Sequence, residues 1–361
     1  MQLANKRLLL LQCRGYGDAV ITTSLINSLG SSFPSLQIDV LTRAPFVSLF
    51  RKNPHVDAIY TAVFPTTRDF RWLGAAGLAL RIARLRGQKY DICLNTAGDF
   101  RENLMGWMVG PVQNRAIRWA EGHPYRNLIR PGLHHLVDHE DEIDHSILNV
   151  YDAHAQVAAN MGCTSIRGPH LYLDGGLLEK VRVTFKGRRV VAIHPLAGHR
   201  SKLWEIEKWR LFVSEISKLG YDVWIFCSQT DATQVEKSFA GIVNGDSVLI
   251  RADSLEDFLV HLSVAKLLVG LDSFAVHVAH ALGVPSIMLS GASDPRIWAP
   301  PSTTVVSGDH ECQFYPCYNR PRCLGTPGEY ICMKSISHDR LLSVTRRLLE
   351  EGAESATSKS R

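Results

Sequence analysis

The chain has 361 residues, 45% hydrophobic and 21% charged, a composition typical of a globular protein with sizeable cores. Its length predicts two domains. With 40 basic and 35 acidic residues the formal net charge is only +5, too small to favour nucleic-acid binding, and no apolar run is long enough to cross a bilayer. The short apolar segment near the N-terminus is followed at once by Arg14 and indicates a strand, not a signal peptide, so we expect a cytoplasmic location.

The first half of the sequence alternates apolar strand-like runs with helical periodicity. The predicted elements are strands at 8–13, 36–41, 56–60 and 90–95 and helices at 19–29, 72–85 and 99–108, the first helix ending at Gly30. Such alternation predicts a parallel sheet covered by helices. We therefore expect a Rossmann-like domain over residues 1–175.

The second half starts the same pattern again after a predicted linker between Gly175-Gly176 and the basic segment 186–189. The predicted elements are strands at 190–194, 223–227, 247–250, 267–269 and 286–289 and helices at 206–219, 232–239, 255–263 and 273–282. A second Rossmann-like domain is expected over 188–335, followed by a helix at 336–351 and a disordered polar tail at 352–361. The fold class is α/β, with two parallel sheets facing across a cleft and ligands at the carboxyl ends of the strands.

The first candidate motif is Gly15-Tyr16-Gly17-Asp18, which follows the first strand. Its two glycines allow a tight turn and a close approach of Gly17 to a ligand. The dinucleotide fingerprint GxGxxG would need a glycine at position 20, where the chain has Val20, so a NAD-dependent oxidoreductase is disfavoured. Asp18 is a candidate general base, and a plain helix N-cap explains the same residue equally well.

The second candidate is the loop His194–Trp204, which follows the first strand of the second domain. Arg200, Ser201 and Lys202 supply the positive charge and hydrogen-bond donors that a diphosphate needs. A basic loop that faces only solvent is the alternative. We favour the functional interpretation because another polar loop follows a strand of the same predicted sheet.

That other loop lies in the strand–helix–strand segment Leu267–Pro300, where Asp272 and Ser273 stand at the start of the helix. Free N–H groups and the helix dipole make such a position favourable for an anion. Asp272 either caps the helix or binds hydroxyl groups of a ligand. His277, about one turn further on, is placed to reach the same pocket, and a core histidine is the alternative.

Four of the eight cysteines, Cys312, Cys317, Cys323 and Cys332, cluster near the end of the second domain. In a cytosolic chain this clustering suggests a structural zinc or iron before a disulfide, although no CxxC pair is present. Reduced cysteines that pack a loop are the alternative. The remaining cysteines lie in apolar surroundings and are expected to be buried.

A basic amphipathic segment, Phe70–Tyr90, is the last candidate. Arginine and lysine residues surround its apolar positions, which is typical of a surface helix with a solvated basic face. The alternative is a contact with an anionic acceptor or a membrane surface.

Three stretches resemble family 9 glycosyltransferases, the ADP-heptose:lipopolysaccharide heptosyltransferases. They are RGYGDAVITTSLINSLGSSFPSLQIDVLTR with NPHVD, then HPLAGHRSKLWEIEKWRLFVSEISKLGYDVWIF, then VGLDSFAVHVAHALGVPSIMLSGASDPRIWAP. The stretches occur in the family's order and span nearly the whole chain. The resemblance implies the GT-B architecture, with the acceptor on the N-terminal domain and the nucleotide sugar on the C-terminal one. It also implies inverting transfer that needs no metal ion.

The resemblance also implies roles for single residues. Asp18 matches the catalytic base, Lys202 the lysine that steadies the donor diphosphate, and Asp272 the acid that contacts the heptose. The further donor-side positions are Ser273, His277 and, in a looser alignment, Asp231.

Two positions depart from the family pattern. Leu196 stands where a glycine is usual, and Phe274 replaces a small residue, so the donor pocket is expected to have its own shape. The cysteine segment CQFYPCYNRPRCLGTPGEYICMKSI resembles one found in many members, with altered spacing.

The expected activity is transfer of heptose from ADP-heptose to a hydroxyl of a lipopolysaccharide core or a related anionic glycan, without a cofactor. The expected protein is cytoplasmic, contacts the inner membrane peripherally and binds no nucleic acid. Three alternatives stay open: a protein O-heptosyltransferase, a transferase or epimerase that uses another nucleotide sugar, and a non-catalytic nucleotide-sugar-binding protein. The joint presence of Asp18, Lys202 and Asp272 argues against the last.

Overall fold

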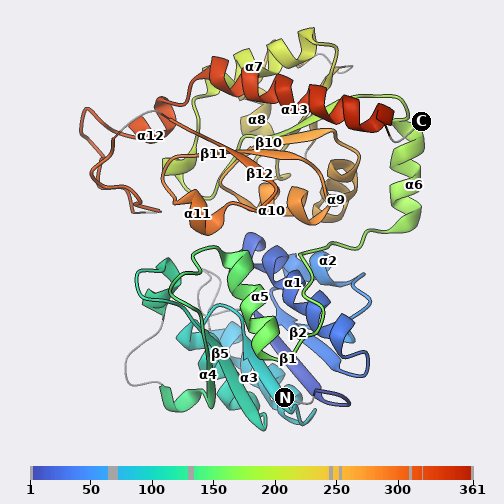
Figure 1. The fold of residues 1–361 in the computed structure, drawn as a ribbon, viewed down its shortest axis with the longest axis vertical. Coiled ribbons are helices and arrows are strands. Elements are labelled where there is room, and N and C mark those ends of the chain that lie inside the picture. The colour runs from blue at the N-terminus through green and yellow to red at the C-terminus, as the bar shows by residue number, and fades with distance from the viewer. Residues whose placement is uncertain are drawn as a thin grey trace. The chain divides into compact units, whose positions relative to one another are not determined.

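The structure is a computed structural model and describes residues 3–63, 72–128, 134–243, 247–251, 254–308, 311–318 and 320–358. The chain forms two compact units, Met1–Tyr172 and Leu173–Arg361. In the described residues each unit contains one six-stranded sheet, and all strand pairs in both sheets are parallel (Figure 1).

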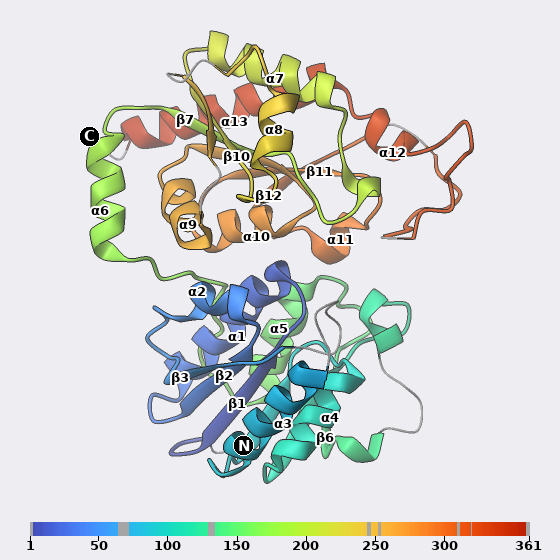
Figure 2. The same cartoon turned by 180° about the vertical axis from the view of Figure 1, so that it is seen from behind.

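The sheet of unit 1 has the order β3-β2-β1-β4-β5-β6. Its strands are β1 (Arg7–Gln12), β2 (Gln37–Thr42), β3 (Ala58–Thr61), β4 (Ile92–Asn95), β5 (Gln113–Arg118) and β6 (His139–Glu142), and its helices are α1 (Tyr16–Ser32), α2 (Val47–Phe50), α3 (Trp72–Arg86), α4 (Phe100–Val109) and α5 (Val150–Asn160). Helices α1 and α5 pack together on one face of the sheet, and α3 and α4 on the other (Figures 1 and 2). The sheet is therefore covered on both faces, which is why β1 is an unbroken apolar run from Leu8 to Leu11, buried at every position.

The sheet of unit 2 has the order β12-β11-β10-β7-β8-β9. Its strands are β7 (Val190–His194), β8 (Asp222–Phe226), β9 (Val248–Arg251), β10 (Leu267–Leu271), β11 (Ser286–Ser290) and β12 (Thr303–Ser307), and its helices are α6 (Gly175–Thr184), α7 (Ile206–Lys218), α8 (Ala232–Ser238), α9 (Leu255–Ser263), α10 (Phe274–Ala281), α11 (Pro295–Trp298), α12 (Ile331–Lys334) and α13 (His338–Ser358). Helix α13 lies beside α7 (Figures 1 and 2), and Trp209, Phe212 and Leu341 from this pair join one buried cluster with the strands.

The two sheets share one topology. In each, the first strand of the unit pairs with both the second and the fourth strand, so the connections leave in opposite directions at that point. This is the doubly wound order, and a ligand is expected where the first and fourth strands end side by side. The switch points are β1/β4 in unit 1 and β7/β10 in unit 2.

Several elements differ from the sequence-based expectation. Helix α6 occupies the predicted linker, with Asp174 capping its first turn through a bond to Leu177 N. Strands β5, β6 and β12 and helix α5 had no predicted counterpart. Helix α13 continues past residue 351 to Ser358, through part of the tail that was expected to be disordered. Of the remaining predicted segments, 359–361 and the start of the basic segment at Phe70 lie outside the described residues.

Glycine at position 30 does not end helix α1, which continues to Ser32. A Cβ at Gly30 would lie 2.3 Å from the ring of His55, so the glycine allows the segment after α2 to pack directly against the helix. A hydrogen bond of 3.0 Å from Asn53 Nδ2 to Asn27 Oδ1 also joins this segment to α1. In the described part of the chain, no helix is both long and apolar enough to span a bilayer.

Candidate active site

Asp18 lies in the first turn of α1, immediately after β1. Its Oδ2 accepts a hydrogen bond of 2.9 Å from Gly15 N, and its Oδ1 accepts one from the Tyr125 hydroxyl. A Cβ at Gly15 would lie only 2.9 Å from Asp18 Oδ2, so a side chain at position 15 would displace this carboxylate oxygen. Gly15 is the N-cap of α1, and Asp18 is not the N-cap that the alternative interpretation proposed. One carboxylate oxygen of Asp18 closes the first turn on the Gly15 backbone, while the other is bound by a side chain from a distant segment.

Tyr125 is fixed by aromatic and cationic neighbours. Its ring packs edge-on against Trp119 at 5.3 Å, and the Arg14 guanidinium lies 4.8 Å from the ring centre. Burial, and then the charge of Asp18, raise the pKa of Tyr125 well above its ordinary value, so the phenol stays protonated and donates. Burial also lowers the pKa of His123 to about 4, and its Nδ1 accepts a hydrogen bond of 3.1 Å from Tyr125 N.

The segment after β4 adds two acids to this site. Asp99 caps α4 through Arg101 N and pairs with Arg14 at 3.1 Å. Glu102, fully buried on the inner side of α4, accepts a bond of 3.2 Å from Cys13 N. Burial, and then the neighbouring charge of Asp99, raise the pKa of Glu102 to about 8. These side chains come from both sides of the β1/β4 switch point, and the sequence analysis missed them because only their position after a strand marks them.

In unit 2, Lys202 and Asp272 form an ion pair of 2.8 Å between Nζ and Oδ2. Lys202 ends a short 3-10 turn (Arg200–Lys202) after β7, and Asp272 follows β10, so the pair lies at the β7/β10 switch point. Asp272 is only 7% exposed. Burial raises its pKa, but the charge of the Lys202 ammonium and the hydrogen bond that it donates outweigh burial and leave the pKa below its ordinary value. Asp272 is therefore ionised at neutral pH.

Ser273 occupies the N-cap position of α10 without capping it. In α9, by contrast, Ser254 Oγ accepts a bond of 3.2 Å from Asp257 N. The Ser273 hydroxyl is shielded from solvent and has no hydrogen-bond partner among the described residues. An unused hydroxyl, the free N–H groups of a helix N-terminus and the ammonium of Lys202 together form a site for an anion. His277 is buried within α10, and its charge also lowers the pKa of Asp272.

Other predicted site residues are placed differently. Ser201 Oγ donates a bond of 3.1 Å to the carbonyl oxygen of Tyr318, so this hydroxyl ties the turn to the cysteine segment. Arg200 is exposed beside it. Asp231 stands at the start of α8, after β8, and accepts a bond of 2.5 Å from Ser228 Oγ. Gly17 lies in the first turn of α1, in unit 1 and apart in sequence from the other donor-site candidates.

The two departures from the family pattern are accommodated by packing. The ring of Phe274 lies 5.3 Å from His194 and 5.4 Å from Phe258. Leu196 is partly buried against the core of unit 2. Both side chains therefore fill space around the end of β7, where the predicted donor loop begins.

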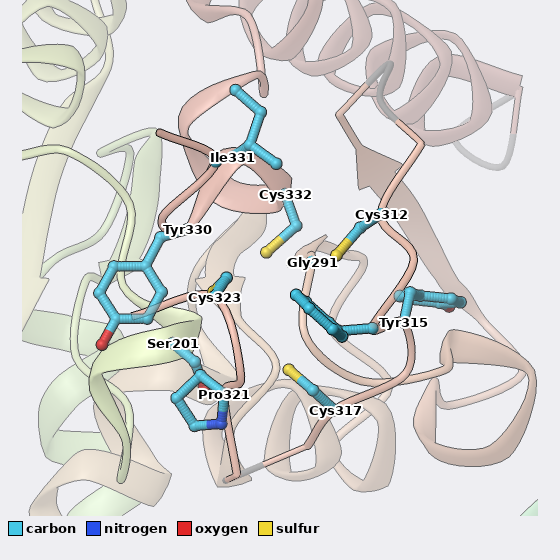
Figure 3. A pocket seen from close by; sticks show the side chains of 12 residues that line it. Ser201, Gly291, Cys312, Tyr315, Cys317, Pro321, Cys323, Tyr330, Ile331 and Cys332 are labelled. Carbon is cyan, nitrogen blue, oxygen red and sulfur yellow. The ribbon is translucent and has the colours of Figure 1, made fainter. Parts of the chain in front are cut away.

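The four clustered cysteines line one small cavity together with Ser201 (Figure 3). Burial, and then the neighbouring thiol of Cys317, raise the pKa of Cys332 to about 11, so this thiol is protonated at neutral pH. Among the residues that the structure describes, no group of three or more histidine, cysteine or acidic side chains is arranged to hold a metal ion. The cysteines gather as their spacing suggested, without forming a metal-binding arrangement.

Two doubly wound units, each with charged side chains at its switch point, are the architecture of the GT-B fold. The structure of the glycosyl transferase family 9 from Veillonella parvula DSM 2008 matches with a TM-score of 0.78 at 17% identity, covering 97% of this chain and 99% of that one. The E. coli ADP-heptose lps heptosyltransferase II matches with a TM-score of 0.74 at 18% identity, covering 96% and 99%.

The sequence itself identifies the family. The profile of glycosyltransferase family 9 (heptosyltransferase) matches residues 80–325, more than half of the chain, and the chain belongs to this family. Lipopolysaccharide heptosyltransferase 3 of Escherichia coli is 24% identical over 313 residues, which are 82% of this chain and 88% of that protein. The protein is therefore a glycosyltransferase, as the motif resemblance implied.

Proposed function

We propose that this enzyme transfers heptose from ADP-heptose to a hydroxyl group of a lipopolysaccharide core glycan. The observation that carries the proposal is the cluster at the β7/β10 switch point, where Lys202, Asp272 and the unused Ser273 hydroxyl surround a helix N-terminus. This cluster offers positive charge to a diphosphate and a carboxylate to sugar hydroxyls. Membership of family 9 and the names of the similar proteins favour heptose and ADP over other sugars and nucleotides.

On the donor side, Lys202 Nζ and the Ser273 hydroxyl bind the diphosphate, and Asp272 accepts hydrogen bonds from the sugar. Asp272 is suited to this role because its pKa is held below the ordinary value. When the bond between the anomeric carbon and the phosphate oxygen breaks, negative charge grows on the departing ADP. Fixed donors stabilise that charge without a metal ion.

On the acceptor side, Asp18 removes the proton of the acceptor hydroxyl while its oxygen attacks the anomeric carbon. The attack comes from the face opposite the leaving phosphate, so the configuration of the sugar inverts. Asp18 Oδ1 is the oxygen for this task, because Oδ2 is engaged with Gly15 N, whereas Oδ1 is held by the hydroxyl of Tyr125, which an acceptor hydroxyl can displace. A positioned base of this kind contributes roughly 10²–10⁴-fold to the rate.

The proposed acceptor is an anionic glycolipid, and the proposed location is the cytoplasmic face of the inner membrane. The family and the names of the similar proteins support the acceptor, and a lipid-linked acceptor would place the enzyme at the membrane. The formal net charge of +5 is compatible with an anionic acceptor.

The cysteine cavity takes no part in this reaction. Four thiolates would satisfy a structural zinc or iron ion and leave no open coordination position. The four thiols do not form such a metal site in this structure, and the proposed transfer reaction uses no metal ion there. Elemental analysis of the purified protein tests the point, because about one equivalent of zinc or iron per chain would mean that the cysteines rearrange around a metal.

The test is a transfer assay with ADP-heptose and heptose-deficient lipopolysaccharide, followed by release of ADP and by mass spectrometry of the glycan. We expect Lys202→Met to raise the donor KM, and Asp18→Asn to lower kcat by about 10²–10⁴-fold with donor binding nearly unchanged. GDP- and UDP-sugars and a serine-containing peptide are the comparison substrates. Preference for another nucleotide sugar, modification of the peptide alone, or donor binding without ADP release would each replace the proposal with one of the alternatives.

A further inference from the structure

Helix α4 has a buried inner face that carries an acidic residue and an outer face that exposes apolar side chains. Its inner face carries Glu102, whose carboxylate bonds to the end of β1, and its N-cap Asp99 pairs with Arg14. Its outer face exposes Leu104, Trp107 and Met108, which at spacings of three and four residues form one stripe. Trp107 is 55% exposed, and Val112, just beyond the helix, is 83% exposed. An aromatic and aliphatic stripe of this kind on a surface helix indicates an interaction site.

Basic side chains adjoin this stripe. Helix α3 packs beside α4 (Figures 1 and 2), and Arg86 Nε lies 3.7 Å from the position that a Cβ on Gly110 would take, at the C-terminal end of α4. Val112 N donates a bond of 3.1 Å to Tyr90 O, which brings the exposed valine next to Lys89. Residues 72–90 contain four basic residues and no acidic one. The α3–α4 surface is defined here as Leu104, Trp107, Met108, Val112, Arg84, Arg86 and Lys89, all of them exposed.

We propose that the α3–α4 surface docks the enzyme on an anionic phospholipid bilayer. Tryptophan, leucine and methionine suit the boundary between headgroups and acyl chains, and arginine and lysine beside them attract acidic headgroups. A second copy of the chain is a poorer occupant, because two such surfaces would bring their uncompensated cations together. The inner face of α4 carries Glu102, which bonds to Cys13 at the end of β1, and its N-cap Asp99 pairs with Arg14, so docking orients the unit whose β1–α1 turn carries the candidate base. That orientation suits a lipid-linked acceptor.

Vesicle flotation of the full-length protein tests this surface. We expect the enzyme to float with phosphatidylethanolamine–phosphatidylglycerol vesicles and to bind phosphatidylcholine vesicles much more weakly. Arg84→Ser/Arg86→Ser should weaken binding about fivefold for each charge removed. The matched control Arg346→Ser/Arg347→Ser changes exposed arginines of α13 and should bind as the wild type does.

Changes in the apolar stripe separate insertion from simple charge attraction. Trp107→Ser should weaken binding, whereas Leu211→Ser, at a position of α7 that is 57% exposed, should not. Brominated lipids should quench tryptophan fluorescence in the wild type. Trp107→Phe should keep binding and reduce that quenching, because Trp119, Trp204, Trp209 and Trp224 are buried and the partly buried Trp298 lies on α11 of unit 2.

Since all these positions are exposed, the circular dichroism spectrum and Tm of the variants should match the wild type. The proposal is wrong if Arg84→Ser/Arg86→Ser and Trp107→Ser bind vesicles as well as the wild type does. It is also wrong if ultracentrifugation shows a dimer that Trp107→Ser dissociates while vesicle binding ignores lipid charge. Flotation needs neither sugar nucleotide nor turnover, so its outcome is independent of the proposed transfer reaction.

Discussion

The carboxylate of Asp18 has two separate tasks in unit 1. Through Oδ2 it closes the first turn of α1 on Gly15 N, and through Oδ1 it accepts a bond from Tyr125. Because the capping bond fixes the carboxylate, the direction of Oδ1 is set by the helix. The Tyr125 hydroxyl donates a hydrogen bond to Oδ1, and the hydroxyl group of the incoming glycan can take its place. We therefore infer that Tyr125 positions the base.

Replacement of Tyr125 by phenylalanine tests this inference. The ring and its packing on Trp119 remain, and only the bond to Asp18 Oδ1 is lost. Without this bond the carboxylate oxygen that is to take the proton is no longer held in place. We therefore expect kcat to fall, with the donor KM and the Tm unchanged. A purely structural tyrosine would instead lower the Tm, which thermal unfolding of the variant measures.

Glu102 predicts a pH dependence of stability. Its pKa is about 8 in the folded protein and close to 4.5 when unfolded, so between these values the folded state binds the extra proton. The free energy of unfolding should therefore fall as pH rises from about 4.5 to 8, by at most about 1.4 kcal/mol per pH unit. Glu102→Gln should remove this slope and be more stable than the wild type at pH 8. Denaturant unfolding of both proteins across this range measures it, and parallel curves would contradict the assignment.

Single residues differ in how far sequence could place them. Lys202 and Asp272 both follow predicted strands of one sheet, so their proximity was foreseeable, and the structure pairs them. Tyr125 is 107 residues from Asp18, and nothing local marks it. The Ser201 hydroxyl, a predicted donor contact, donates a bond to the carbonyl oxygen of Tyr318, 117 residues further on, which local sequence did not predict. Such long-range partners depend on the tertiary packing of loops, which local patterns do not encode.

At the scale of elements, the N-terminus of α10 differs from that of α9. Both have a serine at the N-cap, but only Ser254 uses its hydroxyl to close the helix. The Ser273 hydroxyl is left without a partner among the described residues, beside the Lys202–Asp272 pair. We therefore propose that a bound ligand makes the hydrogen bond that the Ser273 hydroxyl lacks in this structure.

A pair of serine-to-alanine variants separates the two uses. Ser254→Ala should lower the free energy of unfolding by about 1 kcal/mol and leave ADP affinity unchanged. Ser273→Ala should leave stability within about 0.5 kcal/mol of the wild type and weaken ADP binding about tenfold, since it removes a hydrogen bond to a charged group. Calorimetric titration with ADP and denaturant unfolding give both quantities. Equal effects of the two variants on affinity would mean that Ser273 has no special contact with the diphosphate.

Gly30 illustrates where an element boundary was predicted incorrectly. Glycine commonly ends a helix, but here it lies inside α1, because the ring of His55 leaves no space for a side chain. Gly30→Ala should therefore destabilise the protein by about 1–3 kcal/mol, as overpacking does. Gly77→Ala is the control: this exposed glycine in α3 has open space around it, and alanine there should stabilise by about 0.5–1 kcal/mol. Chemical denaturation compares the two.

For the whole molecule, strand–helix alternation was sufficient to predict two parallel α/β units, and the shared doubly wound topology confirms that fold class. The expectation did not include β12, because Thr303–Ser307 is a short, partly buried strand at the edge of its sheet without a long apolar run. Strand β6 was not predicted either, because its sequence, HEDE, is polar and the strand is held by backbone pairing with β5. Edge strands are fixed by their neighbours more than by their own composition.

The switch-point argument leads to a prediction about the division of labour. If unit 2 alone holds the nucleotide, ADP should slow hydrogen exchange in the loop 194–204 and at the start of α10, because ligand binding stabilises the parts that it contacts. The first turn of α1 should exchange at the same rate with and without ADP. Lys202→Met should abolish the protection, whereas Asp18→Asn should preserve it, since Asp18 is assigned to the acceptor. Protection that appears first in α1 would place the nucleotide in unit 1 and reverse the assignment of donor and acceptor. Protection of the loop 194–204 that persists in Lys202→Met would mean that Lys202 does not hold the nucleotide.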